Sequence, residues 1–292
     1  MSGDAARDRS LPLLLLCFFL SGLAALGYET AWTREFAFVF GTSELAVATV
    51  LAAYMAGLAL GAALAARFAA RITRPVLAYG LLELGIALTA LAVPLALAGA
   101  RALYVALWGG LDALPDAGGA ASALFYLVSA FAILLPPTAM MGATLPLLAR
   151  HAVRDEAQIG ARVGLLYAVN TAGAIAGTLL AAFWLLPAIG LRGTVLAAAG
   201  VNALVFVAAT RLARGAGETT TASDWNVDAR APDRASWILP LVLGSGFTSF
   251  TYEVLWVRLI CHLVGSSRAS SRTTARRCRR DGRSAAPTAP RT

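Results

Sequence analysis

Glu83 is the residue of this sequence with the most distinctive chemical setting, because it is an acid inside a long apolar stretch, LAYGLLELGIALTALAVPLAL. A carboxyl group held that far from water must be neutral, paired or hydrogen-bonded, or must face a wet cavity. Such an acid can bind a proton or a cation. The alternative is a carboxyl that only ties neighbouring helices together, and the sequence leaves both roles open.

Asn170 is a second polar side chain within an apolar stretch. If helices enter the membrane from the cytoplasm at Val76 and Gly164, Glu83 lies seven residues in and Asn170 six residues in. At about 1.5 Å per residue these depths are roughly 10 Å and 9 Å. A hydrogen bond between the two side chains is therefore possible if the helices adjoin. The alternative is an ordinary amide contact between helices, worth about 0.6 kcal/mol.

Glu29 and Arg34 form a third group of candidates. Glu29 lies 18 residues past Leu11, about 27 Å along a helix, which is the outer edge of a hydrocarbon core about 30 Å thick. Tyr28 and Trp32 then match the aromatic belt of a membrane interface. Arg34 and Glu29 could form a charged outer gate. The alternative is that this motif only anchors and packs the helix.

The elements that hold these residues must be membrane helices. Hydrophobic residues make up 59% of the chain and charged residues 14%, whereas a soluble domain has about 45–50% and about 25%. A chain with so little polar surface cannot coat a water-facing globule. The net charge of +8 does not indicate nucleic-acid binding, because residues 268–292 alone hold eight arginines and one aspartate.

A helix needs about 20 apolar residues to cross the hydrocarbon core, and seven stretches qualify. The predicted fold class is therefore all-α, a polytopic transmembrane helical bundle. Segment 101–117 is too short to cross and carries Asp112 and Asp116. It is predicted to be an outer-surface loop with an interfacial piece, in which Tyr104 and Trp108 lie at the level of the lipid headgroups. The predicted spans are Leu11–Gly27 (continuing into Tyr28 and Glu29), Leu45–Ala66, Val76–Gly99, Ala120–Leu148, Gly164–Pro187, Thr194–Leu212 and Trp237–Val264.

Two glycine pairs at a spacing of four residues, Gly57 with Gly61 and Gly173 with Gly177, predict close packing between helices. No group of side chains has the spacing of a catalytic, cofactor-binding or metal site. We therefore expect no catalysis, no cofactor and no metal in this chain.

Arginines predict the orientation, because cytoplasmic loops are enriched in them. Loops on one side carry ten and loops on the other carry three. The N-terminal residues 1–10 and the linker 214–236 are thereby assigned to the cytoplasm of a multi-pass protein of the cell (inner) membrane. The ten are Arg67, Arg71, Arg74, Arg150, Arg154, Arg162, Arg211, Arg214, Arg230 and Arg234, and the three are Arg34, Arg101 and Arg192.

The sequence contains an internal repeat: Ser21–Ser43 aligns with Ser245–Ser267 without a gap. Glu253 and Arg258 are the repeat equivalents of Glu29 and Arg34. The repeat predicts a six-helix unit, 11–213, followed by the first helix of a second copy, 237–267; parallel six-helix repeats build the major facilitator fold. Eight positions are identical: Ser21/Ser245, Gly22/Gly246, Tyr28/Tyr252, Glu29/Glu253, Trp32/Trp256, Arg34/Arg258, Gly41/Gly265 and Ser43/Ser267.

The last 25 residues, 268–292, differ from everything before them. They contain no Leu, Ile, Val, Met, Phe, Trp or Tyr. If the second copy has the same orientation as the first, it would place these arginines on the outer side, whereas most loop arginines in the rest of the chain are assigned to the cytoplasmic side. We expect a disordered segment that is out of frame or truncated. The alternative is a genuine polybasic tail that binds anionic lipid.

Three motifs resemble the membrane part of the fused major-facilitator/spermidine-synthase-like proteins of bacteria. They are Tyr28-Glu29 with Trp32 and Arg34, MGATLPLLAR at Met141–Arg150, and GLLYAVNTAGAIAGTLLAAFWLLPAIGLRGT at Gly164–Thr194. The resemblance covers about residues 11–267. It implies further helices and a soluble aminopropyltransferase-like domain, for which this chain has no matching stretch.

Three functions remain open. The first is the integral membrane module of a spermidine-synthase-like, polyamine-related protein without its catalytic domain. The second is half of a major-facilitator-type transporter for a small cationic or amphipathic solute, with Glu83 as the coupling acid. The third is a non-functional truncated product. The partners expected are the lipid bilayer, a second copy or second half, and a cytoplasmic synthase-like domain, but no nucleic acid.

Overall fold

The computed structural model describes residues 2–40, 44–108, 119–153, 156–215 and 238–260. The predicted linker from residue 216 on and the arginine-rich tail lie outside these ranges. The chain divides into two units, Met1–Val227 and Asp228–Thr292, and α7 is the one described element of the second. The main helices are α1 (Ser2–Phe40), α2 (Glu44–Phe68), α3 (Pro75–Trp108), α4 (Ala120–Ala152), α5 (Ile159–Leu180), α6 (Leu186–Gly215) and α7 (Ile238–Ile260).

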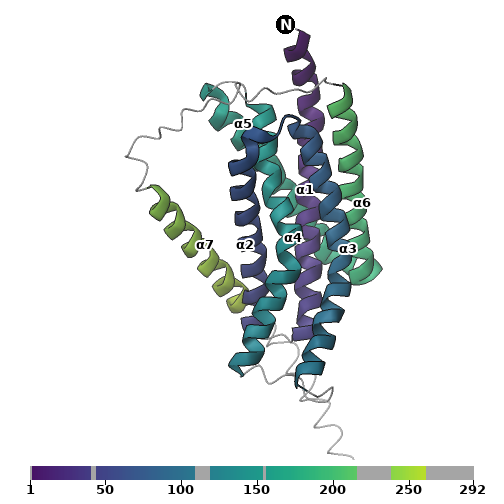
Figure 1. Ribbon diagram of the computed structural model, residues 1–292, viewed down its shortest axis with the longest axis vertical. Helices are drawn as coiled ribbons and strands as arrows, with labels where there is room; N and C mark the ends of the chain where they lie inside the picture. Colours follow the sequence, from purple (N-terminus) through teal and green to yellow (C-terminus); the bar gives the residue numbers. More distant parts are fainter. Residues whose placement is uncertain (1, 41–43, 109–118, 154–155, 216–237, 261–292) are drawn as a thin grey trace, which may run out of the picture. The chain divides into compact units, whose positions relative to one another are not determined.

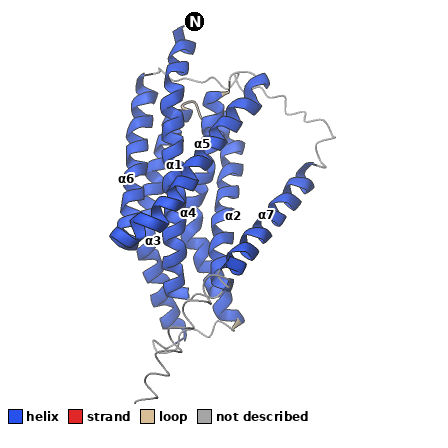
Figure 2. Ribbon diagram, turned by 180° about the vertical axis from the view of Figure 1, so that it is seen from behind, coloured by secondary structure: helices blue, strands red, loops and turns tan. Residues whose placement is uncertain are grey.

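The helices of the first unit are those of a membrane protein. Within the described residues, five stretches are long and apolar enough to cross a bilayer. Large apolar side chains point outward, with Leu95 77% exposed and Phe183 71% exposed, as expected where lipid replaces water as the solvent. The predicted fold class, an all-α polytopic bundle, is confirmed (Figure 2).

Gly190 divides the longest apolar stretch into two spans. That stretch, Ile159–Arg214, has 56 residues, or about 84 Å of helix, against a core of about 30 Å. Gly190 breaks it with φ 69° and ψ −173°, a backbone conformation open essentially to glycine alone. The chain reverses there, and both α5 and α6 pack on α1.

We expect Gly190→Ala to lower the free energy of unfolding by about 1–3 kcal/mol, the usual cost of such a backbone conformation in a residue with a side chain. A Cβ atom at Gly190 would meet no atom within 4 Å, so the loss would come from the backbone alone. Gly200→Ala on the same helix is the control, because that Cβ also meets nothing. Unfolding in mixed micelles measures both, and equal values would contradict the prediction.

The packing of α1–α6 has an internal symmetry. The main contacting pairs are α2 with α4, α1 with α5, α3 with α6, α3 with α4 and α1 with α6. If α1, α2 and α3 are exchanged with α4, α5 and α6, in that order, the same set of contacting pairs results. The six helices run side by side, with the first turns of α1 projecting beyond the neighbouring helices (Figure 1).

The two predicted glycine pairs lie at symmetry-related interfaces, which confirms their packing role. Gly57 and Gly61 of α2 contact α4, and Gly173 and Gly177 of α5 contact the backbone of α1. A Cβ atom added at any of these four positions would come within 2.1 Å of an atom of the facing helix. Small residues thus let the helix backbones approach closely.

Several residues predicted to lie in loops are helical in the structure. The first part of the segment predicted as an outer loop, residues 101–108, continues α3. Its aromatic residues Tyr104 and Trp108 stack at 4.8 Å, and that packing supports the extra turns of helix. Arg150 was also assigned to a loop, but it lies in the last turn of α4 and is 3% exposed. A cation at this position complements the helix dipole.

Candidate functional site

Glu83 lies at the centre of a buried polar network between three helices. Its side chain, on α3, is 0% exposed. The amide Nδ2 of Asn202, on α6, donates a hydrogen bond of 2.5 Å to Glu83 Oε2. Asn202 is itself 1% exposed. The bond therefore joins two side chains that are both withdrawn from solvent, where a polar group without a partner is costly.

Helix α1 extends the network through Tyr28. The Tyr28 hydroxyl donates to Asn202 Oδ1 at 3.3 Å. Asn202 consequently uses both ends of its amide, one toward α1 and one toward α3. The result is a continuous chain of hydroxyl, carboxamide and carboxyl groups that spans three helices. Each group polarises the next in a setting of low dielectric constant.

Two more hydroxyl groups face the same carboxyl. Ser21 of α1 and Tyr79 of α3 lie near enough to interact with Glu83. Neither, however, has hydrogen-bond geometry to it. Among the described residues, Glu83 Oε1 and the Tyr79 hydroxyl both have no hydrogen-bond partner. One oxygen of the acid is therefore fixed by Asn202, while the other is available for a proton or for a hydroxyl that turns toward it.

The helical repeat places these residues together. Tyr79 and Glu83 are four residues apart on α3 and share a face. Ser21 and Tyr28 are seven residues apart on α1, two turns along the same face. Apolar side chains enclose the network, including Cys17 and Phe18 of α1, which are each 2% exposed. This enclosure excludes water and strengthens every electrostatic interaction inside.

The chemistry open to this arrangement is proton binding. A neutral Glu83 carboxyl can donate through Oε1, and a charged one is stabilised by Asn202 and by the nearby hydroxyls. The described residues contain no group of three or more His, Cys, Asp or Glu side chains that could hold a metal ion. The site also has no basic residue among its hydrogen-bonded members, so the acid is held by neutral donors.

The hydrogen bond considered between Asn170 and Glu83 is not formed. Asn170 Nδ2 donates to the backbone carbonyl of Phe18 at 3.0 Å, which matches the alternative of an ordinary contact between helices. The reason is topological: α5, which carries Asn170, packs mainly on α1, whereas α3, which carries Glu83, packs on α4 and α6. Similar depth in the membrane did not make the two residues neighbours.

The predicted aromatic belt at Tyr28 and Trp32 is wrong. Both side chains are 0% exposed and stack on each other at 5.1 Å inside the bundle. The helix continues to Phe40, 11 residues past Glu29, so this motif does not end the span. Glu29 is half-buried and Arg34 is exposed.

Glu253, the repeat equivalent of Glu29, lies on α7, and so does the backbone of Arg258. The side chain of Arg258 lies outside the described residues. The assignment of Glu29, Arg34, Glu253 and Arg258 to a gate stays a prediction.

Sequence reasoning did not identify Asn202, Tyr79 or Ser21 as members of the site. Asn202 carried a usable signal, because it is a carboxamide within the apolar stretch Thr194–Leu212. Ser21 belongs to the repeated motif. The only sequence signal for Tyr79 was its spacing of four residues from Glu83, because tyrosine is common in apolar helices.

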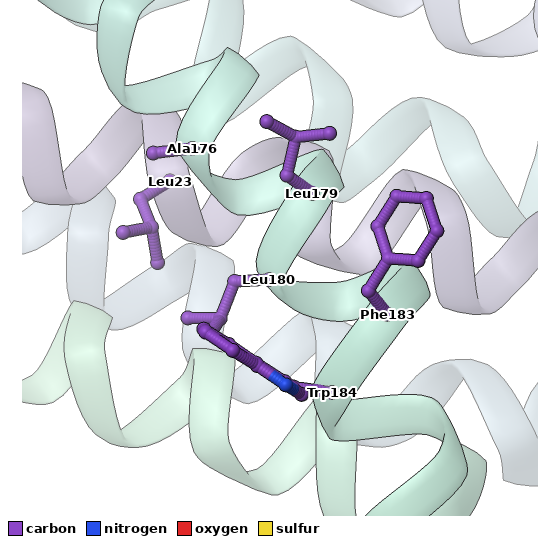
Figure 3. A pocket seen from close by; sticks show the side chains of 6 residues that line it. All are labelled: Leu23, Ala176, Leu179, Leu180, Phe183 and Trp184. Carbon is purple, nitrogen blue, oxygen red and sulfur yellow. The ribbon is translucent and has the colours of Figure 1, made fainter.

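A pocket of about 520 Å³ opens elsewhere, between α1, α5 and the π-helical turn η3 (Ala181–Leu185). Apart from the indole N–H of Trp184, its lining is apolar (Figure 3). Phe183 and Trp184 are exposed at its rim. Such a surface suits an acyl chain, and it offers no charged group for a polar solute. The lining residues are Leu23, Ala176, Leu179, Leu180, Phe183 and Trp184.

Comparison with known proteins does not extend this picture, because no family model, no curated protein and no solved structure matches the chain.

Proposed function

We propose that this chain is the membrane module of a major-facilitator-type protein of the spermidine-synthase-like class, and that Glu83 binds and releases a proton within it. One observation carries the proposal: a fully buried carboxyl, between three membrane helices, has one oxygen bound by Asn202 and the other without a hydrogen-bond partner among the described residues. Intramembrane acids of this kind mark proton relays in transporters.

The packing symmetry supports the family. In major facilitator proteins each six-helix half is itself made of two inverted three-helix repeats. The contacting pairs of α1–α6 stay the same when the two triplets are exchanged. Consecutive spans alternate in direction, so the equivalent helices α1 and α4 run in opposite directions, as an inverted repeat requires. The three sequence motifs of the resemblance all lie on these helices.

The orientation and the location are part of the proposal. The arginine-rich loops of the chain favour a cytoplasmic N-terminus in a cell (inner) membrane. The lipid bilayer is the partner that the apolar helices need. A second six-helix half and a cytoplasmic synthase-like domain are the further partners that the resemblance implies.

Infrared spectroscopy of the protein in liposomes tests the role of Glu83. We expect the carbonyl stretch of a protonated carboxyl, shielded from water, to disappear as the pH is raised and to be missing at every pH from Glu83→Gln. Gln keeps the acceptor for Asn202 and removes only the titratable proton. Glu35→Gln is the matched control, because Glu35 is a less buried acid on α1, and this variant should keep the band.

A second function stays open, that of an anchoring module in which Glu83 only ties helices together. Its complete burial and its short bond to Asn202 favour that role. The same spectra separate the two. A carboxyl band of Glu83 that does not change with pH would rule out proton exchange and leave the anchoring role.

A further inference from the structure

We propose that the Tyr79 hydroxyl is the proton relay of Glu83, and that it passes a proton between the carboxyl and the end of the bundle at which α3 begins. The relay rests on the proposed function, because it requires a Glu83 that exchanges its proton. It adds the end of the bundle from which the proton comes and the side chain that hands it on.

The polar network around Glu83 separates two apolar clusters of the bundle. On α3, Glu83 lies between Tyr79, a member of the near cluster, and Ile86, a member of the far cluster. Asn202 has the same place on α6, since buried members of the far cluster precede it and buried members of the near cluster follow it. A proton that moves along the helices to Glu83 must therefore cross one of the two clusters.

The route through the near cluster is the shorter one. Glu83 lies eight residues from Pro75, the first residue of α3, and 25 residues from Trp108, the last. At about 1.5 Å per residue these distances are about 12 Å and about 38 Å. Among the described buried members of the near cluster, Tyr79 carries the only hydroxyl group. It lies midway between Glu83 and Pro75, so it divides the shorter route into two steps of about 6 Å.

Tyr79 and Glu83 are placed to exchange a proton. They are four residues apart on α3, and helical side chains at this spacing are neighbours on one face. Both are 0% exposed, and among the described residues the Tyr79 hydroxyl and Glu83 Oε1 have no hydrogen-bond partner. The other carboxyl oxygen is held by Asn202. A hydroxyl both donates and accepts, so it can bond to the charged and to the neutral carboxyl.

Two other titratable side chains lie near Glu83, Cys17 and Tyr28, both on α1. The hydroxyl of Tyr28 already donates to Asn202, and Tyr28 belongs to the far cluster. The thiol of Cys17 is a weak donor and a weak acceptor. Tyr79 is therefore the better carrier of a proton on the short route.

The transfer needs no charged tyrosine. Glu83 Oε1–H gives its proton to the Tyr79 oxygen while Tyr79 gives its own proton to a water molecule on the side of Pro75. Two O–H bonds break and two form, and the water leaves as hydronium. The carboxylate keeps its bond from Asn202 and gains one from the Tyr79 hydroxyl. The same steps in reverse return the proton.

The rate at which the Glu83 carboxyl takes up deuterium tests the relay. The full chain in liposomes is moved into heavy water at a pH at which Glu83 is protonated, and the downshift of its carbonyl band is followed by infrared spectroscopy. Glu83→Gln identifies the band. We expect Tyr79→Phe to slow the uptake by at least about tenfold, because a positioned side chain typically speeds proton transfer by about 100-fold or more. Phe keeps the ring and its edge-on contact with Phe18.

Tyr54→Phe is the matched control. Tyr54 is also a buried tyrosine, 2% exposed, but it belongs to the far cluster, and its hydroxyl donates to the backbone carbonyl of Ala25. This variant should take up deuterium at the native rate. Difluorotyrosine at position 79 is a second probe that keeps both the ring and the hydroxyl, and with them the packing. Its hydroxyl gives up a proton more readily, so uptake should be faster than in the native chain.

The outcomes separate the relay from the function on which it rests. A native band that neither changes with pH nor takes up deuterium contradicts proton binding by Glu83, and the relay falls with it. If the native band exchanges and Tyr79→Phe exchanges just as fast, or difluorotyrosine leaves the rate unchanged, the relay alone is overturned. Equal slowing by Tyr54→Phe and Tyr79→Phe also overturns it, because exchange would then follow the opening of the bundle rather than this hydroxyl.

Discussion

Asn202→Leu should lower the free energy of unfolding by about 2–4 kcal/mol. The substitution keeps a side chain of similar size but removes the donor to Glu83 Oε2 and the acceptor for Tyr28. A buried polar group left without a partner costs about 1–3 kcal/mol, and more if it is charged. Two such groups are left here, one of them an acid. Reversible unfolding in mixed micelles of increasing SDS content measures the loss.

Asn170→Leu is the matched control for Asn202→Leu. Both residues are carboxamides in apolar helices, and both donate to an oxygen of another helix. Asn170, however, donates to a backbone carbonyl rather than to a carboxyl. We expect its replacement to cost about 0.6 kcal/mol, the average of hydrogen bonds between membrane helices. Equal losses for the two variants would show that the hydrogen bond from Asn202 to Glu83 stabilises the protein no more than an ordinary hydrogen bond between helices.

The double variant Glu83→Met with Asn202→Leu tests whether the two residues are energetically coupled. Replacing both partners of a buried hydrogen bond by apolar groups of similar shape can be nearly neutral. We therefore expect the double variant to be more stable than Asn202→Leu alone, with only the Tyr28 hydroxyl left without its acceptor. A loss equal to the sum of the two single variants would mean that the residues are not coupled.

The sequence predicted the membrane bundle well because apolar length is a strong constraint. A span needs a long run of apolar residues, and the bilayer admits few alternatives to a helix. Glu83 stood out for the same reason, since one acid in such a run has a large energetic cost. The sequence also predicted two separate spans, Gly164–Pro187 and Thr194–Leu212, within the stretch Ile159–Arg214.

The partners of Glu83 could not be predicted, because they depend on which helices adjoin. Depth along the membrane normal favoured Asn170, yet the neighbour of Glu83 is Asn202. Within a bundle of apolar helices, polar residues at similar depth are distinguished only by helix order and rotation, and packing sets both. Tyr28 and Trp32 show the same limit. Their aromatic character fits both an interface and a helix contact, and only the neighbouring helices decide between them.

Gly177→Ala should lower the free energy of unfolding by about 3 kcal/mol or more, at the upper end of the range for overpacking. An added Cβ would lie 2.1 Å from the carbonyl oxygen of Leu23. The facing group is backbone of α1 and cannot turn aside, so α1 and α5 must separate. Because α1 also carries Ser21 and Tyr28, their separation would disturb the network around Glu83 as well.

The symmetry of the helix contacts gives this prediction a second test. Gly61→Ala on α2 should behave like Gly177→Ala, because its Cβ would lie 1.7 Å from the carbonyl oxygen of Ala139 on α4. Gly164→Ala is the control, since it lies on α5 where an added Cβ meets nothing within 4 Å, and better helix propensity should make it neutral or slightly stabilising. Unfolding in mixed micelles compares all three. If Gly177→Ala were as stable as Gly164→Ala, the close approach of α1 and α5 would be refuted, and with it the packing that holds Ser21 and Tyr28 against α3 and α6.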